Sequence, residues 1–137
     1  MSDGRNETSD QKDIRTLIEN WAAAVRRKDL DGILRRHAPG IVMFDVPPPL
    51  QSTGIEAYRK TWSVFFSWSH DPVIFDITEM RITAGHDVAF ATALMRCSGT
   101  EKNGTDLALD FRLTVGLQKL ERQWVITHEH HSIPAED

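Results

Sequence analysis

Apolar residues recur every three or four positions near the start of the chain. This spacing places them on one face of a helix over about residues 10–28. The face is formed by Ile14, Leu17, Ile18, Trp21 and Val25. Thr8, with Gln11 three residues later, has the pattern of a capping box, in which the two side chains bond each other's backbone N–H groups. The pattern predicts an amphipathic helix that begins just after Thr8.

A short second helix and a strand are predicted next. Asp29 is a suitable N-cap, the apolar positions of residues 30–37 have helical spacing, and Pro39-Gly40 ends the helix. The apolar run over residues 41–46 predicts a strand, which the three prolines at 47–49 end because proline cannot donate to a ladder.

The third predicted helix begins at the capping-box pattern of residues 53–56 and ends at His70-Asp71-Pro72. Its apolar face is rich in rings: Tyr58, Trp62, Phe65 and Phe66. Most of these rings are expected in the core, and some are expected to line a pocket, because small-molecule sites are largely apolar.

Everything after residue 72 has strand character. The segments 73–82, 88–97, 107–117 and 124–133 are predicted strands, and every second residue of 107–117 is apolar. Helices followed by long antiparallel strands predict an α+β fold. Three helices cover only one face of such a sheet. The other face therefore meets water or a second subunit, and a symmetric sheet-to-sheet homodimer is the economical arrangement.

Length and composition limit the classes of protein to which this chain can belong. The 137 residues predict one domain over residues 9–137, after a disordered polar arm over residues 1–8. A net charge of −4 argues against a nucleic-acid partner, and no apolar run approaches the ~20 residues of a membrane span. Cys97, the single cysteine, is expected to be a buried thiol. With no secretory signal visible, a cytoplasmic location is predicted.

Several short motifs, in order, carry a family resemblance. They are Asn20-Trp21-Ala22-Ala23-Ala24, Lys28-Asp29-Leu30-Asp31-Gly32-Ile33, Ile41-Val42-Met43-Phe44-Asp45, Gly54-Ile55-Glu56-Ala57-Tyr58 and the closing run from Trp124 to Pro134. Together they resemble the ketosteroid-isomerase-like, or nuclear-transport-factor-two-like, superfamily, with its polyketide-cyclase-like (SnoaL-like) and kinase-association-domain-like members. The resemblance implies a cone: a strongly curved antiparallel sheet wrapped around N-terminal helices (a cystatin-like α+β roll), with a pocket inside and usually a dimer.

The resemblance assigns a candidate chemistry to Asp45. This residue matches the aspartate that serves the isomerases as proton-shuttling base. It also ends an apolar strand, where burial raises the pKa of a carboxyl group. Asp45 is therefore either a general base acting next to a carbonyl, or a strand-end residue that caps the proline-rich turn.

The isomerases' oxyanion donors are not preserved. Trp21 stands where the resemblance places a tyrosine, and the second donor falls near Thr114. Arg112 is the alternative cationic group, which either binds a substrate carboxylate or enolate or forms an ion pair with Asp110, Asp45 or Glu129. These departures argue against steroid isomerisation itself.

The run His128-Glu129-His130-His131 is unusual. Strand alternation places His128 and His130 on one face with Trp124 and Ile126, and places Thr127, Glu129 and His131 on the other. The resemblance favours the Glu129 and His131 face as the pocket side, where this pair would act as acid and base, and puts His128 and His130 at the dimer contact. No third ligand accompanies the histidines, so no metal is predicted. His37, His70 and His86 are expected to face water.

These observations lead to one hypothesis with two alternatives. The hypothesis is an apolar pocket for a small hydrophobic or carbonyl-containing molecule, used by an isomerase-, cyclase-, dehydratase- or hydrolase-like enzyme without cofactor. Its predicted catalytic residues are Asp45, Glu129 and His131, and its predicted ligand-binding residues are Trp21, Tyr58, Trp62, Phe66 and Arg112. The alternatives are a ligand-binding module without chemistry and an oligomeric scaffold.

Overall fold

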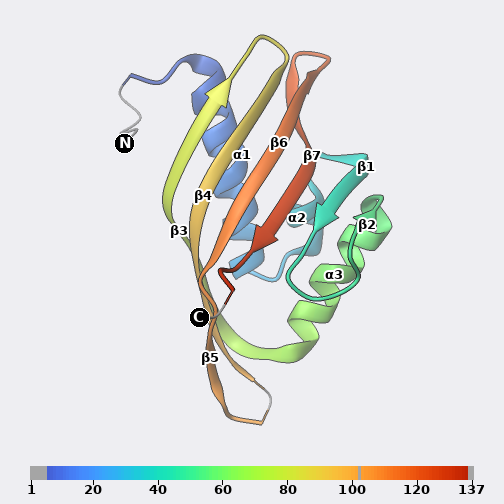
Figure 1. The fold of residues 1–137 in the computed structure, drawn as a ribbon, viewed down its shortest axis with the longest axis vertical. Coiled ribbons are helices and arrows are strands. Elements are labelled where there is room, and N and C mark those ends of the chain that lie inside the picture. The colour runs from blue at the N-terminus through green and yellow to red at the C-terminus, as the bar shows by residue number, and fades with distance from the viewer. Residues whose placement is uncertain (1–5, 102, 136–137) are drawn as a thin grey trace.

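The computed structural model describes residues 6–101 and 103–135, without the side chains of residues 69–72. Three helices lie along one face of a sheet (Figure 1). They are α1 (Ser9–Arg26), α2 (Leu30–Leu34) and α3 (Ile55–Trp68). In the same view α1 crosses behind the long strands, and α3 lies at one side, below β1 and β2. The α+β architecture predicted from the sequence is confirmed.

The strands form one curved, open sheet in the order β2-β1-β7-β6-β4-β3, with β5 paired to β4. Their bounds are β1 His37–Phe44, β2 Ser52–Thr53, β3 Ser69–Ala84, β4 Val88–Glu101, β5 Asp106–Ala108, β6 Phe111–Leu120 and β7 Gln123–Ser132. The sheet is mixed rather than wholly antiparallel, because β1 runs parallel to β7.

The core lies between the helices and the inner face of the sheet. On α1 the predicted apolar face is buried, with Ile14 and Val25 at 0% exposure. The capping box at its start is present: Thr8 Oγ1 accepts from Gln11 N, and Gln11 Oε1 accepts from Thr8 N. Alternation along β4 and β6 buries every second residue against this helix layer. The inner face of the sheet therefore forms one wall of any site that lies between the sheet and the helices.

The second helix is shorter than predicted. α2 ends at Leu34 because Arg35 takes an extended conformation and Arg36 a left-handed one, with φ of 60°. The chain then extends at once, so β1 begins at His37 and includes Pro39 and Gly40, which were predicted to separate helix and strand. The β1–β7 register is irregular between His37 and Val42, which accommodates the missing proline donor.

The predicted strand over residues 107–117 is two strands. β5 forms a hairpin with the end of β4, and β6 begins at Phe111, on the far side of a break at residues 109–110. β4 also continues through Ser98 to Glu101, where a loop was predicted. Both parts of the predicted strand pair with β4 at different places: β5 pairs with residues 98–100, and β6 pairs with residues 88–95, so the chain is interrupted between them.

The last strand contains a bulge that alternation did not predict. The register of β6 and β7 shifts between Gly116–His128 and Leu117–Ile126, so Thr127 is the extra residue. An extra residue moves all later side chains to the opposite face. Trp124 and Ile126 therefore share the buried inner face with Glu129 and His131, and not with His128 and His130 as predicted.

Two further predictions concern the ends of the chain and the membrane. Of the predicted arm, residues 1–5 lie outside the described residues. Glu7 pairs with Arg15 at 2.6 Å, and Thr8 caps α1. Among the described residues no helix is long and apolar enough to cross a membrane.

Candidate active site

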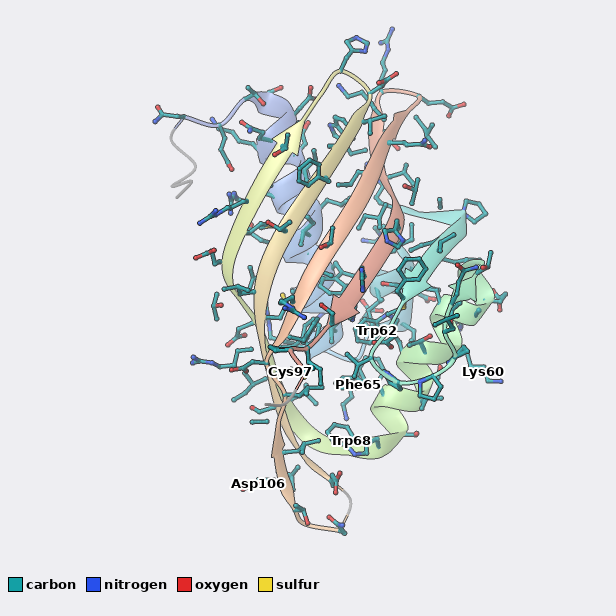
Figure 2. The ribbon with its side chains drawn as sticks, viewed as in Figure 1. Lys60, Trp62, Phe65, Trp68, Cys97 and Asp106 are labelled. Carbon is teal, nitrogen blue, oxygen red and sulfur yellow. The ribbon has the colours of Figure 1, made fainter. Side chains whose placement is uncertain are left out.

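A largely apolar cavity of about 650 Å³ lies between α3 and one end of the sheet. Figure 2 shows Trp62, Phe65 and Trp68 of α3 facing this end of the strands, near Cys97 of β4. The proline segment 47–49 after β1 closes one side, and Leu107 and Leu109 close another. Its size suits a small organic molecule, since such sites typically measure roughly 300–1,000 Å³.

Asp45 lines this cavity at the end of β1. Its side chain is 21% exposed, and its Oδ1 accepts a 2.8 Å hydrogen bond from Val46 N. The same oxygen lies 3.8 Å from His131 Nδ1. The carboxylate is therefore partly buried, lines the cavity and lies next to an imidazole ring.

His131 also lines the cavity and is 7% exposed. Its ring stacks on Phe111, with centroids 5.0 Å apart, and meets Trp21 and Trp62 edge-on or tilted at 6.1 Å. Nε2 lies 3.0 Å from Glu129 Oε1, and Nδ1 faces Asp45. The aromatic walls hold the ring in one orientation, so its two nitrogens have distinct partners.

Glu129 is buried to 1% exposure and accepts three hydrogen bonds. His131 Nε2 bonds Oε1, while His37 Nε2 and the Tyr58 hydroxyl each bond Oε2 at 2.7 Å. Burial by itself raises the pKa of a carboxyl group, but hydrogen bonds from His131 and His37 outweigh it and lower the pKa of Glu129 to about 2. Glu129 is therefore an ionised acceptor, and His131 Nε2 must carry the proton between them.

His37 is the residue that sequence analysis missed. It was expected to face water, yet its side chain is 0% exposed. Nδ1 lies 2.9 Å from Arg35 O, and Nε2 lies 2.7 Å from Glu129 Oε2. Nε2 also lies 3.1 Å from the Tyr58 hydroxyl, so the ring is enclosed by polar partners on both of its nitrogens. Only the early start of β1 puts His37 there, and no local sequence pattern indicates it.

Tyr58 and Trp21 complete this buried group behind the cavity wall. Trp21 Nε1 donates to the Tyr58 hydroxyl at 2.9 Å, and the hydroxyl donates to Glu129. Burial and the negative charge of Glu129 raise the pKa of Tyr58 well above its ordinary value, so the phenol keeps its proton. The Trp21 N–H, predicted as a donor to substrate, is used within the protein instead.

The predicted ligand-binding residues divide between three places. Trp62 lines the cavity. Tyr58 and Trp21 lie behind it, and Phe66 packs against Trp62 without lining it. Arg112 is exposed on the outer face of the sheet, where its Nε donates to Ser132 Oγ at 3.1 Å. It thus does not reach Asp45, Glu129 or the cavity.

Additional lining residues come from the neighbouring elements. Phe65, on the predicted aromatic face of α3, and Trp68, the last residue of that helix, line the cavity, as does the exposed Lys60. Cys97 lines it as well. Burial, followed by the charge of Asp110, raises the pKa of the Cys97 thiol to about 11, so the thiol is protonated at neutral pH. This agrees with the buried thiol predicted from the sequence.

His128 and His130 point away from the site. His128 Nδ1 lies 2.7 Å from Val42 O, and both rings contact Phe44. His86 is exposed at the β3–β4 turn, as predicted, and the side chain of His70 lies outside the described residues. Among the residues that the structure describes, no group of three or more His, Cys, Asp or Glu side chains is arranged to hold a metal ion.

Comparison with known proteins places this fold in a class. The model of the SnoaL-like domain matches residues 14–136. An NTF2-like protein of unknown function from Pseudomonas putida KT2440 is 34% identical, with 95% of this chain and 90% of that chain covered and a TM-score of 0.85. A search of the curated proteins found no match.

Two more distant structures share the fold. A ketosteroid isomerase-like protein from Erwinia carotovora atroseptica is 15% identical, covering 94% of this chain and all of that chain (100%), with a TM-score of 0.79. The association domain of CaMKII from C. elegans is 18% identical, covering 91% and 96%, with a TM-score of 0.71. The fold defines the NTF2-like, ketosteroid isomerase-like class. Within it, the chain belongs to the SnoaL-like domain family.

Proposed function

We propose that this protein binds a small, largely apolar carbonyl compound in the cavity beside α3 and catalyses proton transfer on it with Asp45 and His131. The observation that carries this proposal is the position of the His131 ring. It lies at the wall of the cavity, between the carboxylates of Asp45 and Glu129 at 3.8 and 3.0 Å.

The two carboxylates have different tasks because their surroundings differ. Glu129 is out of contact with the cavity and saturated by donors, so it holds the His131 tautomer and stabilises positive charge on that ring. Asp45 faces the cavity with one carboxylate oxygen that accepts no hydrogen bond from the described residues. Asp45 is therefore the group able to accept a proton from a bound molecule.

The proposed step is an enolisation. Asp45 takes a proton from the carbon next to the carbonyl. The electron pair of the broken C–H bond forms a C=C double bond to the carbonyl carbon, and the π pair of the C=O bond moves to the oxygen. His131, protonated on both nitrogens, donates a hydrogen bond from Nδ1 to that oxygen while Glu129 holds Nε2. Return of the proton to the same carbon gives back the ketone. In a carbonyl compound with a double bond between its β and γ carbons, return of the proton to the γ carbon completes an isomerisation.

Hydrogen exchange tests this proposal without knowledge of the natural substrate. Cyclohexanone, 1-indanone and 2-tetralone would be incubated in D2O with the protein, and loss of their α-protons would be followed by NMR. Wild type is expected to accelerate exchange of at least one ketone. Asp45→Asn and His131→Gln are each expected to reduce the acceleration by about 100-fold or more, the usual contribution of a general acid or base.

Asp87→Asn is the matched control, because it removes an exposed carboxylate in the β3–β4 turn, away from the cavity. It is expected to exchange protons at the wild-type rate. Wild-type activity in Asp45→Asn, or no acceleration of any of the three ketones, would overturn the catalytic assignment. Retention of a small molecule by wild type in native mass spectrometry without any exchange would favour the non-catalytic binding module instead.

We also propose that the outer face of the sheet pairs with a second copy of the chain. Phe90 and Leu94 on β4 are 51% and 47% exposed there, close to the outward-facing His128 and His130 of β7. The similarity to the CaMKII association domain supports self-assembly through this fold. In a dimer with two-fold symmetry the same patch of each copy contacts the other copy, so one self-complementary patch on the sheet is sufficient.

A further inference from the structure

A second cavity, of about 670 Å³, is lined by residues of α1, of the connection from α2 to β1 and of the β6–β7 turn. None of its lining residues lines the first cavity. It is therefore a separate candidate site, to which the proposed enolisation gives no role.

Four arginines line this second cavity: Arg27, Arg35, Arg36 and Arg122. Asp13 is the single acidic residue among the lining residues. Arg27 is paired with Asp29 at 3.5 Å, whereas the structure shows no ion pair for the other three within its described residues. Positive charge is thus concentrated here, although the chain as a whole carries −4.

The backbone at two of these arginines is in a conformation that arginine rarely adopts. Arg36 has φ of 60° and Arg122 has φ of 69°. Glu121 and Arg122, both left-handed, connect β6 to β7 as a two-residue turn, for which Asn-Gly is the favoured sequence. Glycine at position 122 would avoid the steric penalty of a left-handed conformation, whereas this chain has an arginine there that lines the cavity.

Neutral hydrogen-bond donors accompany the arginines. Thr16 and Asn20, four residues apart on the exposed face of α1, and Gln123 at the start of β7 also line the cavity. A hydroxyl, two amides and several guanidinium groups form a donor-rich surface. Guanidinium groups bind carboxylate and phosphate oxygens through paired hydrogen bonds, so the complementary ligand is rich in acceptor oxygens and negative charge.

We propose that this arginine-lined cavity binds a small polyanion, a molecule with at least two phosphate or carboxylate groups. The volume admits a molecule of metabolite size. Three arginines that form no ion pair with any described residue supply the charge, and two of them, Arg36 and Arg122, lie at left-handed backbone positions. Phosphate and carboxylate share this recognition chemistry, and the choice between them is an outcome of the test.

Isothermal titration calorimetry of the full chain with pyrophosphate and with citrate tests the proposal. At least one of these ions is expected to bind with 1:1 stoichiometry, and its affinity is expected to fall as NaCl is raised, because salt screens exposed charges. The double variant Arg36→Gln, Arg122→Gln is expected to weaken that binding by 10-fold or more. Arg59→Gln, which removes an exposed arginine of α3 outside both cavities, is the matched control and is expected to bind as wild type does.

Each result decides the proposal. Binding of pyrophosphate only identifies a phosphate ligand, binding of citrate only identifies a polycarboxylate, and binding of both shows that charge and oxygen number dominate. No binding of either ion, or equal loss of affinity in Arg59→Gln and in the double variant, would overturn the proposal. Circular dichroism of each variant would confirm that the fold is unchanged.

Discussion

At the scale of single residues, the candidate active site depends on one buried carboxylate. Glu129 accepts from His37, Tyr58 and His131, and it is ionised because the hydrogen bonds from His131 and His37 outweigh the effect of burial on its pKa. Its negative charge fixes the proton on His131 Nε2 and leaves Nδ1 to the cavity. The proposed reactive pair of Asp45 and His131 thus includes a ring that is positioned by Glu129, which does not line the cavity.

The pairing of His37 with Glu129 predicts a large effect on stability. His37→Gln removes one partner of a buried pair and leaves Glu129 poorly compensated, and the loss of one partner of a buried pair costs about 3–5 kcal/mol in comparable cases. His86→Gln, at an exposed turn, is expected to change stability by less than about 0.5 kcal/mol. Urea unfolding of both variants measures the difference. Similar free energies of unfolding for the two would show that the buried pair contributes nothing.

The lowered pKa of Glu129 predicts how stability depends on pH. A carboxyl whose pKa falls from 4.5 to about 2 on folding stabilises the folded state above pH 4.5, and this stabilisation is lost as the pH falls towards 2. The loss for wild type is expected to exceed that for Glu129→Gln by on the order of 3 kcal/mol. Urea unfolding of both proteins between pH 5 and pH 2 measures it. Parallel pH profiles would contradict the ionised, hydrogen-bonded carboxylate.

At the scale of elements, the parallel pairing of β1 with β7 assembles the site. Met43 is opposite Glu129 and Phe44 is opposite His130, so Asp45, the next residue along β1, comes beside His131. The other end of β1 places His37 next to the carboxylate of Glu129. The bulge at Thr127 then turns Glu129 and His131 inwards. Without both features the four titratable side chains would not meet.

At the scale of the whole molecule, one layer of helices leaves the sheet with two unlike faces. The inner face carries the core and the first cavity, and the outer face carries exposed Phe90 and Leu94. The arginine-lined cavity opens elsewhere, between α1 and the β6–β7 turn. A dimer formed by the outer faces would therefore leave both cavities accessible.

The proposed dimer predicts a change of mass. Phe90→Glu with Leu94→Glu places like charges in the proposed contact, so light scattering coupled to size exclusion is expected to give a dimer for wild type and a monomer for the double variant. Leu50→Glu, at a side chain 96% exposed outside the sheet, is the control and is expected to stay dimeric. A monomeric wild type, or a dimeric double variant, would contradict this interface.

Sequence patterns predicted most helices and strands, because helical spacing, strand alternation and capping depend only on neighbouring residues. The spacing from Ile14 to Val25 and the Thr8 capping box define α1, and the aromatic stripe from Tyr58 to Phe66 defines α3. Local patterns failed where tertiary contacts decide the backbone. The break at residues 109–110, the early start of β1 at His37 and the bulge at Thr127 all follow from pairing with distant strands.

The candidate site divides in the same way. The sequence by itself determined the fold class, the SnoaL-like resemblance, and Asp45, Glu129 and His131 as the groups to examine, because periodicity and short motifs are properties of neighbouring residues. Only the tertiary structure decided that His37 joins them, that Trp21 and Tyr58 support Glu129 from behind, and that Arg112 points away. The physical reason is that register between distant strands, and hence the face on which each side chain lies, is set by packing of the whole sheet on its helices.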